Sequence, residues 1–199
     1  VLPLGALERR RLVEVRLVRR ALVDAAEDLP GGDRLEQHEI DAGAHGVFFA
    51  TQLASYRLLA VDEYERFGKA YDLRVLAALA GKARLSMLHA HGDDIMFDLL
   101  ADYPVEMINW HDRLTEPTLR DAASRFPGLL VGGLNEHGAL AKGDLHAVEA
   151  EVRDAIAQTG GRRLMIGPGC VVPVATTDAA IGAALRATRE SARQPLRTS

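Results

Sequence analysis

Leu85-Ser86-Met87-Leu88 leads directly into His89-Ala90-His91-Gly92, and this stretch contains the pattern on which the predicted fold rests. A short run of mostly bulky residues is typical of a strand in a parallel sheet, where both faces are covered. Polar residues and glycine follow the run at once. The pattern recurs at residues 46–50, 105–108, 129–131 and 164–166, which lead into Thr51-Gln52, Asn109-Trp110-His111-Asp112-Arg113, Gly132-Gly133-Leu134 and Gly167-Pro168-Gly169-Cys170.

Helical patterns lie between these runs. Apolar residues recur at three-to-four spacing over residues 62–79 and 145–156, and Gly160-Gly161 marks the end of the second segment. Strands that alternate with helices indicate parallel strands joined by right-handed crossovers. The repeat of about thirty residues is the size expected when ~250 residues form eight units. The sequence therefore predicts an α/β fold of (β/α)8 TIM-barrel type, incomplete, with about five C-terminal βα units.

A doubly wound open sheet is the alternative, because periodicity alone does not distinguish it from a barrel. Polar residues follow every predicted strand, as they do at the end of a barrel where active sites are built. An open sheet places such residues mainly at its switch point. This distribution favours the barrel.

The chain divides into three predicted segments. Residues 1–32 are expected to be a divergent, arginine-rich helical segment, residues 33–190 the partial barrel, and residues 191–199 a disordered, polar tail. Shorter helices are expected over residues 12–28, 33–41 and 93–101, after Thr115-Glu116-Pro117, and from Thr177 toward Ala187.

Composition sets limits on the class of protein. The 199 residues carry a net charge of -4, which gives no general attraction to nucleic acid or to an anionic membrane. No apolar run reaches the ~20 residues that a membrane-spanning helix needs, and the start does not have the pattern of a signal peptide. The single cysteine cannot form an internal disulfide. We therefore predict a cytoplasmic protein without nucleic-acid or membrane partners.

His89, His91 and Cys170 are the candidate metal ligands. His89 and His91 lie two residues apart, so a continuing strand would point both to the same side. Cys170 also follows a predicted strand, and strand ends approach one another around a barrel mouth. Two histidines, one cysteine and an open position suit a catalytic zinc site. The alternative is a pair of hydrogen-bonded histidines and a buried, inert cysteine.

A second polar cluster follows the run at residues 105–108. Arg113 suits a carboxylate or phosphate, His111 or Asp112 could transfer protons, and Asn109 would line the pocket. The alternative is an internally satisfied loop in which Asp112 pairs with Arg113. Three further residues are predicted to contact substrate: Gln52, Trp110 and Gly133. A tight turn at Gly132-Gly133 is the commoner alternative, and Trp110 is most simply an aromatic of the core or of the barrel mouth. Asn135, Glu136 and His137 are less distinctive.

The polar strand ends, taken together, resemble the uroporphyrinogen decarboxylase superfamily. The resemblance runs in order from about residue 42 to residue 185, as a joint match of many short stretches. The matching stretches are Ala42-Gly43-Ala44-His45-Gly46-Val47-Phe48-Phe49-Ala50-Thr51-Gln52, Leu88-His89-Ala90-His91-Gly92, Tyr103-Pro104-Val105, Ile108-Asn109-Trp110-His111-Asp112-Arg113, Gly132-Gly133-Leu134 and Gly167-Pro168-Gly169-Cys170-Val171-Val172-Pro173 with Thr177.

The resemblance implies one of two chemistries. One branch decarboxylates uroporphyrinogen without a cofactor, and usually carries His at the final strand-end motif. The other comprises cobamide-dependent methyltransferases, which hold zinc through a His-x-Cys pair and a distant Cys. Cys170 and His89 match the second branch, whereas His91 stands where that branch has Cys. Histidine is also a zinc ligand, but fewer thiolates leave the zinc-bound sulfur less electron-rich.

The family's N-terminal portion, roughly its first three βα units, has no counterpart in this sequence. That portion carries the decarboxylase's substrate-binding arginine and aspartate, and we expect the chain to be a fragment or to need a partner. The main hypothesis is a zinc-dependent methyltransferase-type enzyme that acts on a small molecule, with a corrinoid protein as partner and methyl donor. Formation of a homo-oligomer is one way in which the incomplete barrel could be completed. The alternatives are a cofactor-free porphyrinogen decarboxylase and an inactive barrel fragment that serves as a subunit.

Overall fold

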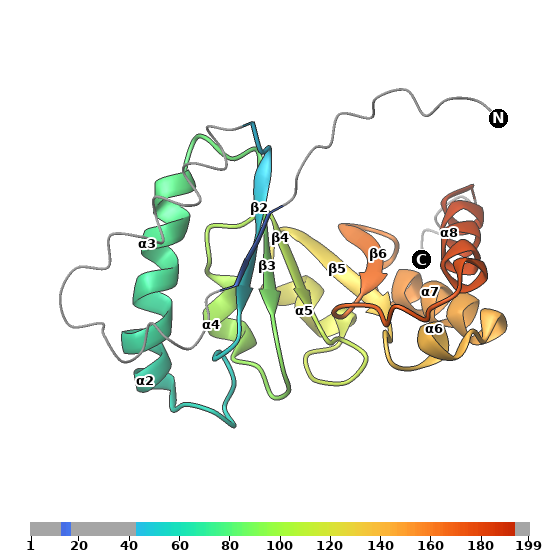
Figure 1. Cartoon of the computed structure of the whole chain (residues 1–199), viewed down its shortest axis with the longest axis horizontal. Helices are drawn as coiled ribbons and strands as arrows, with labels where there is room; N and C mark the ends of the chain where they lie inside the picture. The colour runs from blue at the N-terminus through green and yellow to red at the C-terminus, as the bar shows by residue number, and fades with distance from the viewer. Residues whose placement is uncertain (1–12, 17–42, 194–199) are drawn as a thin grey trace.

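A single parallel sheet organises the molecule (Figure 1). The computed structural model describes residues 13–16 and 43–193. The sheet has six strands, each parallel to its neighbours and ordered as they occur in the chain. They are β1 (Val13–Arg16), β2 (Gly46–Thr51), β3 (Leu85–Ala90), β4 (Met107–Trp110), β5 (Leu129–Leu134) and β6 (Leu164–Pro168). Sequential order without a switch point identifies a partial barrel, so the predicted fold class is confirmed and the doubly wound alternative is excluded for the described strands.

From β2 onward, helices connect the described strands as the alternating pattern predicted. Thr118 caps one helix by accepting from Asp121 N–H, Asp144 caps another by accepting from Ala147 N–H, and Gly160 ends the latter in a left-handed conformation. The helices are α2 (Val61–Tyr64), the π-helical turn η2 (Glu65–Lys69), α3 (Ala70–Leu79), α4 (Phe97–Ala101), α5 (Leu119–Arg125), α6 (Ala139–Lys142), α7 (Leu145–Thr159) and α8 (Asp178–Arg193).

The two faces of the sheet are built from alternate residues. The face toward the helices forms the main core, and its side chains are at most 1% exposed at Val47, Phe49, Leu88, Ile108 and Leu130. Residues of the opposite, inner face line up across the strands through the parallel register. One such row consists of Phe48, Met87, Met107 and Leu129, and the next row toward the strand ends consists of Ala50, His89, Asn109 and Val131.

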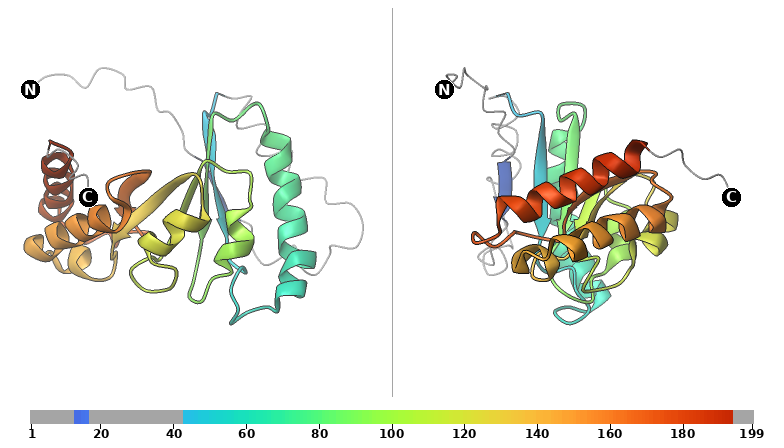
Figure 2. Two further views of the ribbon diagram at one scale, coloured as in Figure 1. Left: turned by 180° about the vertical axis from the view of Figure 1, so that it is seen from behind. Right: turned by 90° about the vertical axis from the view of Figure 1, so that its right-hand side faces the viewer.

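A second, smaller core lies between α7 and α8. The alanines Ala180, Ala183 and Ala187 recur at helical spacing on α8 and are at most 1% exposed against Val148 and Val152 of α7. The two helices lie together at the β6 end of the sheet (Figure 2, right). Small side chains therefore allow α8 to pack closely on α7.

A buried polar network, here called the tyrosine cluster, joins the end of β2 to helices α2 and α3. The Asp72 carboxylate accepts hydrogen bonds from Tyr64 OH at 2.8 Å and from Tyr103 OH at 2.7 Å. The two tyrosine hydroxyls lie 2.9 Å apart, and Thr51 Oγ1 lies 3.2 Å from Tyr64 OH. Burial first, and the nearby Asp72 charge second, raise the pKa of both tyrosines, so they remain protonated donors.

Three local expectations differ from the structure. Val13–Arg16 form a strand where the sequence predicted part of a helix; the alternation of Val13 and Val15 with charged residues has the period of two that suits a strand. Helix α8 continues to Arg193, past the predicted start of the tail at residue 191. The short helix α6 was not expected. The remaining residues of the predicted segments 1–32, 33–41 and 191–199 lie outside the described residues.

None of the helices in the described part of the chain is both long and apolar enough to span a membrane.

Candidate metal centre

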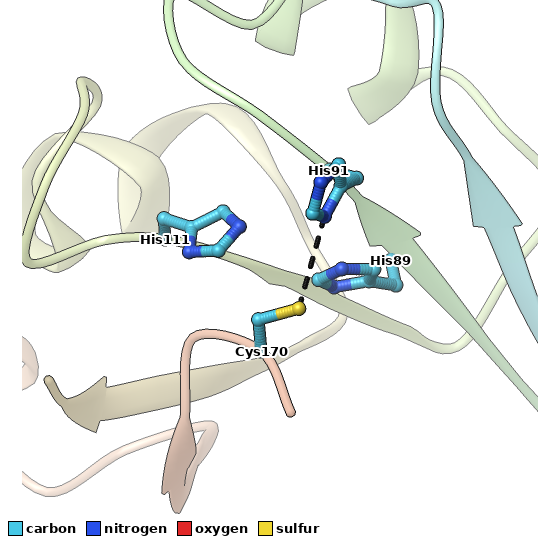
Figure 3. A group of neighbouring side chains, drawn as sticks. All are labelled: His89, His91, His111 and Cys170. Atoms are coloured by element: carbon cyan, nitrogen blue, oxygen red, sulfur yellow. Dashed lines mark hydrogen bonds between the residues drawn. The ribbon is translucent and has the colours of Figure 1, made fainter. Parts of the chain in front are cut away.

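Four potential metal ligands converge at the carboxyl ends of three strands (Figure 3). His89 lies at the end of β3 and His91 follows it, His111 comes directly after β4, and Cys170 comes shortly after β6. One ligand atom from each side chain lies within 4.8 Å of the others. His89 and His111 are buried, whereas His91 and Cys170 are partly exposed. We call these four residues the metal cluster.

Parallel register explains why the histidines meet. His89 pairs with Asn109 on the neighbouring strand, so both side chains point to the inner face. His91 and His111 each lie two residues further along their chains, which returns them to the same face. The ring centroids of His91 and His111 are 5.3 Å apart, and the Phe48 ring stacks against His89 at 5.5 Å.

Cys170 reaches the cluster because Gly169 allows the loop after β6 to pass close to β4. A Cβ atom at Gly169 would lie 2.8 Å from the Cα of His111 and 3.1 Å from the carbonyl oxygen of Trp110. It would also lie 3.0 Å from Oε2 of Glu136. Any larger residue would therefore push the loop, and Cys170 with it, away from the histidines.

Asn109 fixes the orientation of the His89 ring. The Asn109 amide nitrogen donates to the carbonyl oxygens of Val131 at 2.8 Å and Pro168 at 3.0 Å, so its oxygen faces Nδ1 of His89 at 2.7 Å. Nδ1 must then carry the proton, which leaves the lone pair on Nε2. Burial lowers the pKa of His89 to about 4, against the opposing effect of the Asn109 hydrogen bond. His89 is therefore neutral at neutral pH, as a metal ligand must be.

Glu136 orients His111 in the same way, but through a carboxylate. Its Oε1 lies 2.6 Å from Nδ1 of His111, and the residue is 1% exposed. Burial is the largest single effect and opposes ionisation of Glu136, but the hydrogen bond from His111, a backbone hydrogen bond and the nearby His111 and His137 together outweigh it, so the pKa of Glu136 is lowered. The carboxylate thus accepts the Nδ1 proton, and Nε2 of His111 is the nitrogen available for a metal.

The donor set fits zinc. Zinc–nitrogen bonds of about 2.05 Å and a zinc–sulfur bond of about 2.3 Å place the ligand atoms of a tetrahedral site about 3.3–3.6 Å apart. Sγ of Cys170 and Nδ1 of His91 are 3.7 Å apart, already close to that separation. The remaining ligand atoms lie within 4.8 Å of one another, so binding would draw them together to about 3.3–3.6 Å. Three imidazoles and one thiolate also favour zinc over harder cations, which prefer oxygen ligands.

The other two predicted catalytic residues are engaged outside the cluster, Arg113 by β5 and α7 and Asp112 by β5. Arg113 donates through Nε to the Gly133 carbonyl at 2.9 Å and through Nη2 to the Glu151 carbonyl at 2.7 Å, and it forms an ion pair with Asp154. Asp112 accepts from Gly133 N–H at 2.9 Å. Burial raises the pKa of Asp112 to about 6, against the opposing effects of Gly133 and Arg113. These contacts match the alternative of an internally satisfied loop, and only His111 joins the cluster.

The predicted substrate contacts are dispersed. Gln52 is exposed directly after β2. Trp110 is 0% exposed and donates from Nε1 to the Pro117 carbonyl at 2.9 Å, so its indole belongs to the core. Gly133 has φ +103° and faces Ala155 of α7, where a Cβ would come within 2.7 Å. Asn109 lies behind His89. Direct contact of these residues with a substrate stays a prediction.

Sequence reasoning missed two features of the site. It assigned His111 to proton transfer and not to the metal ligands. The register pairs His89 with Asn109, so His111, two residues after Asn109, aligns with His91, two residues after His89. Sequence reasoning also set Glu136 aside. The available signal was its position just after β5, where a long side chain can reach across the strand ends.

A partial (β/α)8 barrel with a histidine–cysteine cluster at its strand ends is thus the class that fold and site define. Residues 35–191 match the uroporphyrinogen decarboxylase (URO-D) family, so the chain belongs to that family. No curated protein sequence matches it closely.

A solved structure shares the fold. It is described as a methyltransferase from Methanosarcina mazei, with a TM-score of 0.68 and 20% sequence identity. The match covers 81% of this chain and 46% of the other, so this chain spans about half the length of that protein. At this identity the likeness establishes the fold alone.

Proposed function

We propose that this chain carries the metal-binding half of a zinc-dependent methyltransferase of the URO-D family. The observation that carries the proposal is the convergence of His89, His91, His111 and Cys170, with ligand atoms within 4.8 Å of one another. The solved structure that shares the fold is titled a methyltransferase, so the fold is compatible with this chemistry. The substrate would be a small molecule, and a corrinoid protein would be the methyl donor.

The four residues of the metal cluster would bind zinc through two kinds of ligand. Cys170 would provide the thiolate and the histidines would provide neutral nitrogens, with His89 kept neutral by burial. A bound zinc ion lowers the pKa of a thiol at the site and so makes it nucleophilic at neutral pH. A thiol or phenolic acceptor would then take the methyl group. Four protein donors fill a tetrahedral site, so the acceptor needs a fifth position or the departure of one donor.

The decarboxylase alternative is less well supported by the geometry. It would assign substrate carboxylates to Arg113 or His111. The Arg113 guanidinium is engaged by Gly133, Glu151 and Asp154, and His111 is held by Glu136. A substrate carboxylate would have to displace these partners, at the cost of leaving buried groups unpaired.

Zinc content of the purified protein tests the proposal. We expect about one zinc per chain in the wild type and loss of that zinc in Cys170→Ala and His89→Ala, because each removes a ligand. His146→Ala is the matched control, since His146 is exposed on α7 and away from the cluster. Well-folded wild-type protein that takes up no zinc would overturn the proposal, and so would equal zinc in all four proteins.

A further inference from the structure

We propose that Glu136 is a positioning residue that supplies the second negative charge of the metal site through His111. The inference rests on the proposed zinc site and goes beyond its ligands. It concerns a residue that neither the sequence pattern nor the ligand set points to.

The four ligands of the metal cluster do not balance the charge of a zinc ion. A zinc ion bound by three neutral imidazoles and the Cys170 thiolate keeps one net positive charge. His89 and His111 are 4% and 8% exposed, so that charge would be partly buried, which is costly without compensation. A second negative charge close to the ligands would neutralise the site.

Glu136 stands where that charge is needed. Its carboxylate is 1% exposed and accepts from Nδ1 of His111 at 2.6 Å, slightly shorter than the about 2.7–2.9 Å usual for a charge-assisted N–H···O hydrogen bond. A carboxylate behind a ligating histidine fixes the tautomer and strengthens the nitrogen that faces the metal. With Glu136 included, the two negative charges balance the divalent ion.

The other buried carboxylate near His111 is occupied elsewhere. Asp112 accepts from Gly133 N–H and lies 3.6 Å from Arg113, which balances its charge. Besides His111, the basic side chain recorded near the Glu136 carboxylate among the described residues is the exposed His137, with Nε2 at 4.0 Å. The charge of Glu136 is thus directed mainly to His111.

The structure contains an internal comparison for this role. His89 and His111 are held in the same way through Nδ1, but Asn109 is neutral and Glu136 is a carboxylate. Glu136 also lies against the loop that carries Cys170, because Oε2 is 3.0 Å from the position that a Cβ at Gly169 would take. One residue therefore orients a nitrogen ligand and borders the sulfur ligand.

Zinc affinity measured by competition with a chromophoric chelator tests the role. We expect Glu136→Gln to weaken zinc binding about 10- to 100-fold, while Glu190→Gln, an exposed carboxylate on α8, leaves it unchanged. His91→Cys introduces a second thiolate and should restore affinity in the Glu136→Gln background. In a double-mutant cycle, the gain from His91→Cys should be larger in the Glu136→Gln background than in the wild type, where the carboxylate already supplies the charge.

The outcomes separate this inference from the proposed function. Wild-type protein that binds no zinc overturns both. Zinc binding equal in wild type and Glu136→Gln overturns the role of Glu136 and leaves the metal site standing. Equal gains from His91→Cys in both backgrounds also overturn it, because a purely structural glutamate would not couple to a new thiolate. If Glu136→Gln does not fold, the same cycle with Glu136→Met removes the carboxylate while all four ligands stay in place.

Discussion

The tyrosine cluster and the metal cluster are both buried and polar, but their hydrogen-bonding groups are directed differently. In the tyrosine cluster, two hydroxyls donate to the single carboxylate of Asp72, and the partners face one another. In the metal cluster, the outward ring nitrogens of His89 and His111 are held by Asn109 and Glu136, so their inward nitrogens carry lone pairs.

This difference separates a structural cluster from one built to bind. Donors and acceptors of the tyrosine cluster satisfy each other, so it stabilises the junction of β2, α2 and α3 without any addition. Lone pairs gathered at one place repel each other and are satisfied by a cation. Each cluster should therefore respond to its own perturbation and not to that of the other.

The largest effect should follow from removal of the sulfur ligand. Cys170→Ala should weaken zinc binding by more than about 100-fold, beyond the effect expected for an outer partner. Its free energy of unfolding in the presence of a chelator should stay within about 0.5 kcal/mol of the wild type, because the side chain is small and partly exposed. Isothermal titration calorimetry with zinc measures the affinity, and urea unfolding measures the stability. A large loss of stability in the metal-free variant would contradict the distinction between a binding cluster and a structural one.

Asp72→Ala should have the opposite pattern. It leaves the buried hydroxyls of Tyr64 and Tyr103 without their acceptor, and we expect the free energy of unfolding to fall by about 2–4 kcal/mol. Zinc affinity of the folded variant should be unchanged. Urea unfolding followed by circular dichroism, with the chelator titration in parallel, checks both parts. Loss of zinc binding in folded Asp72→Ala would show that the clusters are coupled.

Added zinc should stabilise only proteins with an intact metal cluster. At a free zinc concentration of about 100 times Kd, the native state gains about 2.7 kcal/mol, which raises the melting temperature. Asp72→Ala should gain the same amount from its lower starting point, whereas Cys170→Ala, with affinity weakened at least about 100-fold, should gain no more than about 0.4 kcal/mol. Differential scanning calorimetry with and without chelator measures this shift, and an equal shift in all three proteins would indicate zinc binding elsewhere.

The smallest effect concerns pH. Burial raises the pKa of Asp72 above its ordinary value, against the opposing hydrogen bonds of Tyr103 and Tyr64. The folded state then holds this proton more tightly than the unfolded state does. The resulting stability is fully present below the unfolded pKa of about 3.8 and is lost as pH rises through the higher folded pKa.

Asp72→Asn should remove this contribution. In chelator, the stability of the wild type relative to Asp72→Asn should fall as pH rises from about 4 toward neutrality. Glu190→Gln should leave the wild-type profile unchanged, because that carboxylate is exposed on α8. Urea unfolding over a pH series gives the comparison. A rise in the relative stability of the wild type over the same range would contradict the direction of the Asp72 shift.

The core strands were predictable because their signal is local. A bulky run that ends in polar residues identifies each of β2 to β6 from its own sequence, and alternation with helices fixes the parallel arrangement. Residues 13–16 were misread because a short alternating segment inside an arginine-rich stretch is ambiguous between helix and strand.

The site was predictable only where a strand end places it. His89, His91 and Cys170 could be chosen because all three lie at the ends of strands that meet at one end of the sheet. The alignment of His111 with them depends on the register of β3 against β4, and the reach of Glu136 depends on side-chain direction after β5. Neither the register nor the side-chain direction can be predicted from the local sequence pattern.

The Phe48 ring beneath His89 has a consequence for how fast a metal ion could exchange. The ring lies nearly parallel to the imidazole, at 22°, and belongs to the apolar row next to the cluster on the inner face. Ions cross such apolar surface slowly because they must shed water. Kinetic access therefore comes from the strand-end loops, past the partly exposed His91 and Cys170, which would be the first ligands to capture an ion and the last to release it.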